Sequence, residues 1–487
     1  MMKEARVHHN TMMHESIITS SDDPDTLIVK SDLLRAELSL RARGAALLSF
    51  MARLGFGLTL VLIPFRLRLD LLPRPFPPIY ADYTDFLLFA SDITLLVALA
   101  SWLISLTLES RRLYLGPLYL TVPIAGLTSI GLLSAFFSVD SSLSLYHSIR
   151  LVILLGMYLY VVNEIRSVRQ IIFPIAGMLF VQSVVGIIQA LSQGSLGLQS
   201  LGELPLNPNW NGVSIVWAEG IRSLRAYGLT DHPNILGGCL AFGMILLAGW
   251  YIDPGSKWRP AISGIFSLSA LALLYTFSRS AWLALLGGIG SIVILLILSK
   301  QKTTIRILFG LLAVSLILLV PFVWQNAGFL GVRFNWHGSF RSAPQENQSI
   351  GERILLNRAA NEIFTEHALI GVGLGVFPRA LQAKYPEFSL NYQPPHMTLL
   401  DVAAEIGIFG ALFYAIAMIA PWLALWSNRK KAIFSPELLS VIALLIAVSI
   451  VGFFDYYTWL LAPGRLWQWL AWGLWGSVYV VSRGKNG

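Results

Sequence analysis

Apolar residues along this chain come in long runs, and polar or charged residues gather between them. A run of roughly 17–25 apolar residues can cross a hydrocarbon core about 30 Å thick as an α-helix. Such runs predict twelve transmembrane helices, at residues 45–65, 86–108, 117–137, 146–163, 171–192, 235–252, 261–278, 280–299, 305–324, 397–426, 436–454 and 465–482. The pattern therefore predicts an all-α polytopic membrane protein.

The boundary between the seventh and eighth predicted helices depends on one short polar break. Residues 261–299 are apolar apart from the break at Phe277-Ser278-Arg279-Ser280. A single helix over that range would be much longer than a bilayer is thick. We therefore predict a tight helical hairpin whose tip carries Arg279.

Basic residues occur in every second connection between these helices, and such loops are usually cytoplasmic. With twelve helices they all fall on one side, so both termini are predicted to be cytoplasmic. The residues concerned are Arg111, Arg112, Arg166, Arg169, Lys257, Arg259, Lys300, Lys302, Arg306, Arg429, Lys430 and Lys431, with Arg35, Arg41 and Arg43 before the first helix and Arg483 and Lys485 after the last.

Two long connecting segments then face the opposite, extracytoplasmic side. The chain divides into a cytosolic N-terminal tail (1–44), a five-helix part (45–192), an extracytoplasmic loop (193–234), central helices (235–324), a large extracytoplasmic loop (325–396) and C-terminal helices (397–487). The tail is polar, carries charges of both signs, and is expected to be disordered up to a short amphipathic helix near 32–43.

The large loop contains a helical pattern of its own. Apolar residues recur at helical spacing over 352–367, and a glycine-rich stretch at 371–375 follows as a helix stop. We expect this helix to lie over the outer membrane face as a lid. The glycines could be read as a nucleotide-binding loop, but no strand precedes them and they lie outside the cytosol.

Composition agrees with a membrane protein. Hydrophobic residues make up 55% and charged residues 13%, the mean hydropathy is +0.65, and the net charge is +8. Soluble domains carry about 25% charged residues. The single cysteine, Cys239, lies inside a predicted helix and excludes an internal disulfide framework. We predict no metal, no cofactor and no nucleic-acid partner.

Three residues at helix ends on the extracytoplasmic side are the strongest candidates for a functional site: Arg225, Arg279 and His396. Charged groups at membrane depth are costly and usually mark a substrate path. Two cations and a proton-carrying group on a side that is otherwise poor in basic residues predict an anionic ligand.

Each arginine also has a structural explanation. Arg225 precedes Pro233-Asn234, which are good helix-start residues, and Arg279 at a hairpin tip could extend to the membrane surface. The first explanation leaves Arg225 unexplained on a side that is poor in basic residues, and the second does not account for a hairpin tip with one arginine and no acid. Guanidinium groups bind phosphate oxygens with two parallel hydrogen bonds. We therefore assign both arginines to an anion site.

His396 follows Pro394-Pro395 and opens the tenth predicted helix. A lone histidine at a membrane interface is often only a polar surface residue, but the two prolines fix this one at a helix mouth. A helix N-terminus favours the neutral imidazole, which can accept a proton as a general base. We therefore predict a catalytic role for His396.

Further polar residues are assigned to substrate binding or to structure. Arg222 is a second candidate beside Arg225. Asp401 and Glu405 share a helix face at membrane depth, so they should pair with an arginine or border a polar cavity. The weaker candidates are interpreted as helix caps (Asp231, His232) or as structural ion pairs and interfacial anchors (Asp92, Arg53, Arg150, Asp455, Arg465).

Several of these residues lie in runs that resemble the signatures of the O-antigen ligase and O-antigen polymerase superfamily. The resemblance covers about 220–415, includes the outer-loop stretch 351–377, and departs at Met397, where the family often has asparagine. The runs are Arg225…Gly228…Pro233-Asn234, Thr276-Phe277-Ser278-Arg279-Ser280-Ala281 and His396…Leu400…Glu405-Ile406-Gly407…Gly410.

This resemblance implies a C-type membrane glycosyltransferase fold in the bacterial inner membrane, acting in lipopolysaccharide or polysaccharide assembly. The donor would be a glycan on undecaprenyl diphosphate, transferred with inversion and without a metal. Arg225 and Arg279 would hold the diphosphate. His396 would deprotonate or position the acceptor hydroxyl, or bind phosphate.

The acceptor separates two versions of this function. A ligase would use lipid A core or another hydroxyl acceptor, and a polymerase would use a second lipid-linked glycan. One large outer loop with a helical lid favours the ligase. A transporter or channel for an anion would use the same arginines as a selectivity site and is the alternative of another class.

Overall fold

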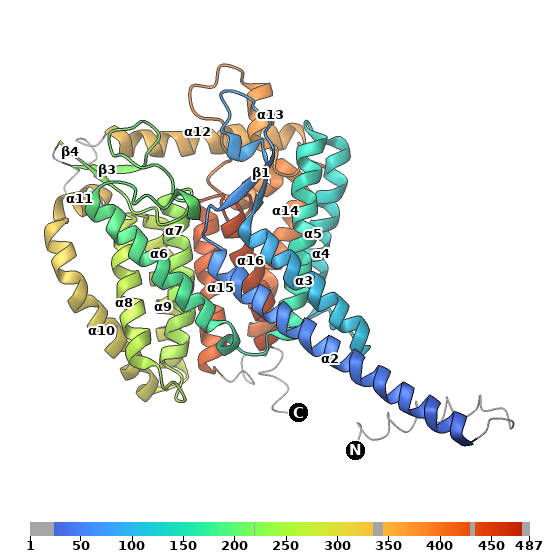
Figure 1. Ribbon diagram of the computed structural model, residues 1–487. Helices are drawn as coiled ribbons and strands as arrows, with labels where there is room; N and C mark the ends of the chain where they lie inside the picture. Colours follow the sequence, from blue (N-terminus) through green and yellow to red (C-terminus); the bar gives the residue numbers. More distant parts are fainter. Residues whose placement is uncertain (1–23, 219, 335–343, 429–433, 480–487) are drawn as a thin grey trace.

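The computed structural model describes residues 24–218, 220–334, 344–428 and 434–479, and it forms one helical bundle (Figure 1). A helix occupies each of the twelve predicted positions, so the all-α polytopic fold is confirmed. These helices are α2 (Pro24–Leu62), α3 (Ala90–Glu109), α4 (Leu118–Ser134), α5 (Ser141–Glu164), α6 (Ile172–Ser192), α7 (Pro233–Tyr251), α8 (Arg259–Tyr275), α9 (Arg279–Leu298), α10 (Lys302–Gln325), α14 (Thr398–Ser427), α15 (Pro436–Phe454) and α16 (Ala462–Leu474).

The membrane-crossing character of the bundle follows from length and composition. Within the described residues, 10 helices are long and apolar enough to cross a membrane. The other two are α8, with 17 residues, and α16, with 13. Helix α16 continues into a π-helical turn, Trp475–Tyr479, and the predicted end of this span at 480–482 lies outside the described residues.

The core of the bundle lies along α7, α15 and α16. The most apolar window of α7 is 83% buried within the protein, whereas that of α10 is 22% buried. All 13 residues of α16 are buried, including Trp467, Trp469 and Trp472. Helix α10 therefore faces lipid, and α7 and α16 fix the geometry of the bundle interior.

The N-terminal region differs from the prediction. Helix α2 is continuous over 39 residues, where we expected a disordered tail up to a short helix at 32–43 and a separate first span from 45. Residues 32–43 consist almost entirely of Leu, Ala, Arg, Glu and Ser, most of them strong helix formers, so no break separates them from the span. The part of the predicted tail at 1–23 lies outside the described residues.

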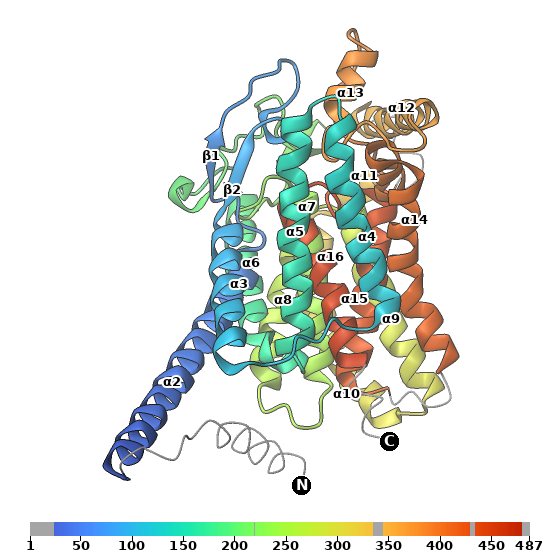
Figure 2. The ribbon, with the colours of Figure 1, turned by 90° about the vertical axis from the view of Figure 1, so that its right-hand side faces the viewer.

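The bundle end that carries the long connecting segments also holds the short elements of the chain (Figures 1 and 2). Strand β2 occupies 86–89, which we had placed in the second span. It pairs antiparallel with β1, and helix α3 starts only at Ala90 because Asp92 accepts a hydrogen bond from Phe89 N. The elements at this end are β1 (Arg68–Leu72), β2 (Phe86–Phe89), β3 (Ile215–Ala218), β4 (Ile221–Leu224), α11 (Ala327–Arg333), α12 (Pro344–Glu366) and α13 (Phe377–Lys384).

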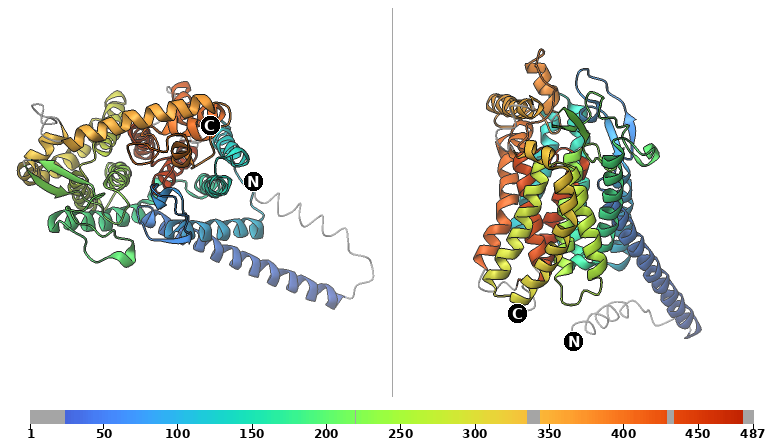
Figure 3. Two further views of the ribbon diagram at one scale, coloured as in Figure 1. Left: turned by 90° about the horizontal axis from the view of Figure 1, so that it is seen from above. Right: turned by 90° about the vertical axis from the view of Figure 1, so that its left-hand side faces the viewer.

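The predicted lid helix is part of α12, which has 23 residues and begins earlier than 352. Figure 3 shows α12 from above, running along the ends of the bundle helices at the position predicted for a lid. The loops with Arg111, Arg169 and Arg259 lie at the opposite end of the bundle (Figure 1).

The glycine-rich stretch after α12 packs closely against the backbone of α14. Helix α14 is interrupted at Gly407, whose φ is +70° and whose missing Cβ would lie 2.3 Å from Leu369 O. Ile408 N donates to Ala368 O over 2.7 Å, and Gly373 N donates to Glu405 O over 2.8 Å. The glycines therefore let the loop hydrogen-bond with the backbone of an interrupted helix, which positions the outer loop on α14.

Candidate functional site

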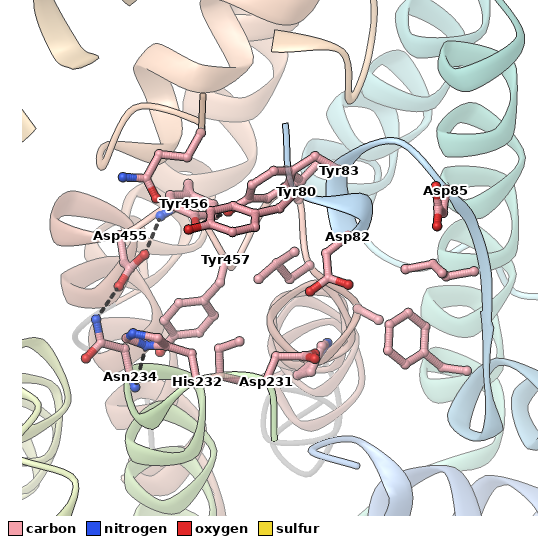
Figure 4. Close-up of a pocket in the computed structure, with 18 of the residues that line it drawn as sticks. Tyr80, Asp82, Tyr83, Asp85, Asp231, His232, Asn234, Asp455, Tyr456 and Tyr457 are labelled. Atoms are coloured by element: carbon pink, nitrogen blue, oxygen red, sulfur yellow. Dashed lines mark hydrogen bonds between the residues drawn. The ribbon is translucent and has the colours of Figure 1, made fainter. Parts of the chain in front are cut away.

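A polar cavity of about 310 Å³ opens at the end of the bundle below the connecting segments. Figure 4 shows that its walls come from the β1–β2 connection, the start of α7 and the segment after α15. Cavities of this size, with a few convergent polar groups, are typical of small-ligand sites. Its polar lining residues are Arg68, Tyr80, Asp82, Tyr83, Asp85, Tyr146, His147, Arg150, Ser214, Asp231, His232, Asn234, Asn391, Gln393, His396, Asp455, Tyr456 and Tyr457.

Of the three strongest candidates, His396 is the one that lines this cavity. It lies just before α14, whose N-cap is Met397, and its side chain is 15% exposed. The ring of Tyr456 packs edge-on against the imidazole at a centroid distance of 5.2 Å. His396 therefore lies at the start of a helix, as predicted. Tyr456 packs against its imidazole ring, and part of the ring faces the cavity.

A chain of polar contacts joins His396 to Arg225. His396 Nδ1 lies 3.6 Å from Asp455 Oδ1, which is an ion-pair distance longer than a hydrogen bond. Asn234 Nδ2 donates to Asp455 Oδ2 over 3.1 Å. Arg225 Nη2 donates in turn to Asn234 Oδ1 over 2.6 Å. The first and third sequence signatures therefore meet through Asp455, whose contact with Asn234 is drawn in Figure 4.

The surroundings of Asp455 favour its ionised form. Burial alone would raise its pKa, but the contact with His396 and the positive charge of Arg353 outweigh burial and lower the pKa to about 2. A carboxylate beside Nδ1 of a histidine favours the tautomer that carries its proton on Nδ1. Nε2 of His396 is then the nitrogen able to accept a proton.

His232 is a neutral helix cap. Burial first, and then the charge of Arg225, lower its pKa to about 3. Its Nδ1 accepts a hydrogen bond from Asn234 N over 3.1 Å, so Nε2, at 2.9 Å from Ser214 Oγ, carries the proton. The capping role predicted for His232 agrees with this geometry, and the cap fixes the turn that presents Asn234.

The two arginines are not part of the cavity lining, although Arg225 contacts the lining residue Asn234. Arg225 is 6% exposed, and its Nε donates to Thr276 O over 2.6 Å. Arg279 is half-buried as the first residue of α9, three residues after Thr276 and just past the tight turn between α8 and α9. The predicted hairpin is thus present, and Arg225 connects its tip to the histidine. Neither arginine is a lining residue of the cavity.

The structure places the predicted substrate-binding acids away from the cavity. Asp401 and Glu405 are both fully buried on α14, and neither lines the cavity. Glu405 accepts hydrogen bonds from Trp459 Nε1 over 2.9 Å and from Phe377 N over 3.4 Å. This acid therefore ties the glycine-rich loop and the segment after α15 to α14, and its placement favours a structural role over substrate contact.

Three further predicted residues, Arg222, Arg150 and Asp231, make contacts with other parts of the protein. Arg222 is half-buried on β4, paired across the hairpin with Trp217, and does not line the cavity. Arg150 Nη2 and Asp92 Oδ2 form an ion pair at 2.9 Å, in line with the structural role predicted for them, and Arg150 also lines the cavity. Asp231 is an ion-pair partner of Arg66 at 2.5 Å, which differs from the helix-capping role predicted for it.

Sequence reasoning missed two parts of the site. One is the loop between β1 and β2, where Tyr80, Asp82 and Asp85 face the cavity. The density of acids and tyrosines between apolar runs was the available signal. The other is Arg353 on α12, whose charge acts on both Asp455 and His232. Among the described residues, no three His, Cys, Asp or Glu side chains are grouped as metal ligands.

Fold and site together define a multi-pass membrane protein with a histidine–carboxylate pair in a polar cavity at one end of its bundle. Residues 264–415 match the family described as O-antigen ligase, which confirms the predicted resemblance for that part of the chain. The match includes Arg279 and His396, while Arg225 and Asp455 lie outside it. No curated protein matches the chain.

Proposed function

We propose that the protein transfers a glycan from undecaprenyl diphosphate to an acceptor hydroxyl at the extracytoplasmic face of the bacterial inner membrane. The observation that carries this proposal is the chain Arg225–Asn234–Asp455–His396, which joins a cationic group to a histidine in the cavity. The family match to O-antigen ligase supports glycan transfer in general.

In the proposed reaction, the acceptor oxygen attacks the anomeric carbon while His396 Nε2 takes the hydroxyl proton. The bond between that carbon and the diphosphate oxygen breaks, and its electron pair leaves with the lipid diphosphate. Arg279 and Arg225 stabilise the charge that grows on the leaving group. Asp455 stabilises the imidazolium, and one displacement inverts the anomeric centre.

The direct test is transfer by the purified protein in liposomes. With a labelled lipid-linked glycan and candidate acceptors, we expect a covalent product and release of undecaprenyl diphosphate in equal amounts. Lipid A core as the preferred acceptor would support the ligase, which the helix α12 over the site favours, and a second lipid-linked glycan would support the polymerase. Movement of an anion without covalent product would contradict transfer and favour a transporter.

Orientation can be tested separately. The proposal places the loop with Ser200 outside and the end of α14 with Ser427 inside, because basic loops lie at the Ser427 end of the bundle. A cysteine at 200 should react with an impermeant thiol reagent in intact cells, and one at 427 only after lysis. The parent protein is the control, since its Cys239 is buried. Labelling at 427 in intact cells would reverse the orientation.

Asp455→Asn tests the histidine–carboxylate pair. Asparagine keeps the shape and an oxygen for Asn234, but its amide nitrogen next to His396 Nδ1 favours the tautomer with the proton on Nε2. Turnover should fall about 10²–10⁴-fold with little change in donor affinity. The comparison variant is Asp253→Asn, at an ion pair with Arg169 at the other end of the bundle. Unchanged turnover in Asp455→Asn would remove Asp455 from the mechanism.

A further inference from the structure

The cavity has two chemically different sides. Asp455, Asn234 and His396 lie on one side, next to the buried Arg225. Figure 4 shows Asp82 and Asp85 away from Asp455 and Asn234, on the connection between β1 and β2, which also contributes Tyr80 beside Tyr83. A reaction between two substrates needs two binding regions that meet at the catalytic group, and this division supplies them.

The charges on the second side are held by partners within the protein. Arg68 contacts Asp82 directly and lies 3.6 Å from Asp231, while Arg66 lies 2.5 Å from the same oxygen of Asp231. Carboxylates oriented in this way have lone pairs left to accept hydrogen bonds from hydroxyl groups. Because Arg66 and Arg68 already balance the charge of these carboxylates, the ligand does not have to be a cation.

A phosphate or carboxylate would be disfavoured on this side. Asp82 and Asp85 both line the cavity there, and the guanidinium of Arg68, which lines it as well, is already paired with Asp82 and Asp231. Burial together with the charge of Asp82 raises the pKa of the neighbouring Asp231 to about 6. With Arg68 already paired to carboxylates, a neutral ligand fits this side better than an anion.

Planar polar and aromatic side chains complete this side. Tyr80 is 51% exposed although it lines the cavity. Asn391, exposed, and Gln393, half-buried, line it from the segment that leads into His396. Among the described residues, neither amide has a hydrogen-bond partner. Amides that can both donate and accept, beside an aromatic ring with an apolar face, suit a ring that bears hydroxyls on its edge.

This side is also connected to the catalytic histidine. Tyr83 and Tyr456 share a hydrogen bond of 2.5 Å between their hydroxyls, and the ring of Tyr456 packs against His396. Gln393 precedes His396 by three residues. A sugar bound by Tyr80 and Asn391 would therefore share one cavity with the imidazole that is to receive its proton.

We propose that the segments Tyr80–Asp85 and Asn391–Gln393 form the acceptor subsite, and that the part of the acceptor bound there is an uncharged sugar. The inference rests on the proposed function and deepens it, because it separates the acceptor from the diphosphate of the donor. In the proposed function the diphosphate is bound toward Arg225 and Arg279, and the acceptor would lie across the cavity from Asn234, which Arg225 contacts.

The test uses the full-length protein and two synthetic probes, a neutral hexose-terminated oligosaccharide glycoside and the same compound with a phosphate on its terminal sugar. Tyr80→Ala and Asn391→Ala should each raise the KM for the neutral acceptor about three- to tenfold. The KM for the lipid-linked donor and the turnover at saturating acceptor should not change. Tyr114→Ala is the matched control, since Tyr114 is 45% exposed at the opposite end of the bundle.

Binding of the neutral glycoside without donor, followed by saturation-transfer NMR, keeps this inference distinguishable from the proposed function. Binding that is lost in Tyr80→Ala but kept in Tyr114→Ala would support the subsite even if no glycan were transferred. An unchanged acceptor KM in both subsite variants, an equal rise in donor KM, or a preference for the phosphorylated probe would overturn it. Transfer by the wild-type protein in those cases would leave the proposed function intact.

Discussion

Replacing His396 with alanine is expected to abolish glycan transfer while lipid-linked donor still binds. The imidazole is needed only when the acceptor hydroxyl attacks, so its loss should act on turnover and not on donor affinity. A general base contributes about 10²–10⁴-fold to the rate. Turnover with a labelled donor and donor binding to the same purified protein would be measured together.

The matched control is His367→Ala. His367 is an exposed histidine at the end of α12, outside the cavity, and its removal should leave turnover unchanged. If His396 binds phosphate instead, donor affinity would fall with turnover and His396→Arg would keep activity. Full activity of a correctly inserted His396→Ala protein would remove the residue from the mechanism and leave the arginines as the site.

Arg279→Lys should lose most activity although the charge is kept. An ammonium group cannot form the two parallel hydrogen bonds that a guanidinium forms with phosphate oxygens. Loss of one such contact in a water-poor site costs about 2–4 kcal/mol of transition-state stabilisation, or about 30- to 1,000-fold in turnover. Arg259→Lys, at the other end of the bundle, is the comparison variant and should behave as wild type.

If Arg279→Lys has wild-type turnover, Arg279 does not bind the diphosphate and serves only to anchor the helix end at the membrane surface. Arg225→Ala should also be impaired, and for an additional reason: it leaves Thr276 O and Asn234 Oδ1 without their donor. Thermal unfolding measured beside turnover would separate the two causes, because the Arg225 change removes buried hydrogen bonds to Thr276 O and Asn234 Oδ1 from the protein itself.

The helices were predictable because the bilayer imposes one requirement on every span, an apolar run of sufficient length. The hairpin at Arg279 followed from the same length argument. The prediction of a separate helix at 32–43 before the first span was wrong, because the high helix propensity of these residues outweighs their polarity and joins them to the span. Strand β2 was missed because four apolar residues next to a long apolar run look like the start of that run.

The site was predictable only in part, because its contacts join segments far apart in sequence. His396 was found from the prolines before it, which fix a helix start. Asp455 was taken as a structural ion-pair partner because the sequence does not show that the end of α15 lies beside Asn234 and His396. Asp401 and Glu405 share a face as expected, but that face packs into the protein interior.

The most direct test of the account is the anomeric configuration of the product. His396 deprotonates the acceptor, and the acceptor oxygen attacks the anomeric carbon in a single displacement, so the new glycosidic bond should have the configuration opposite to that of the donor. NMR of product formed by the purified protein from a donor of known configuration would decide this. Inversion is the predicted result. Retention would require a second displacement through another nucleophile and would contradict the mechanism.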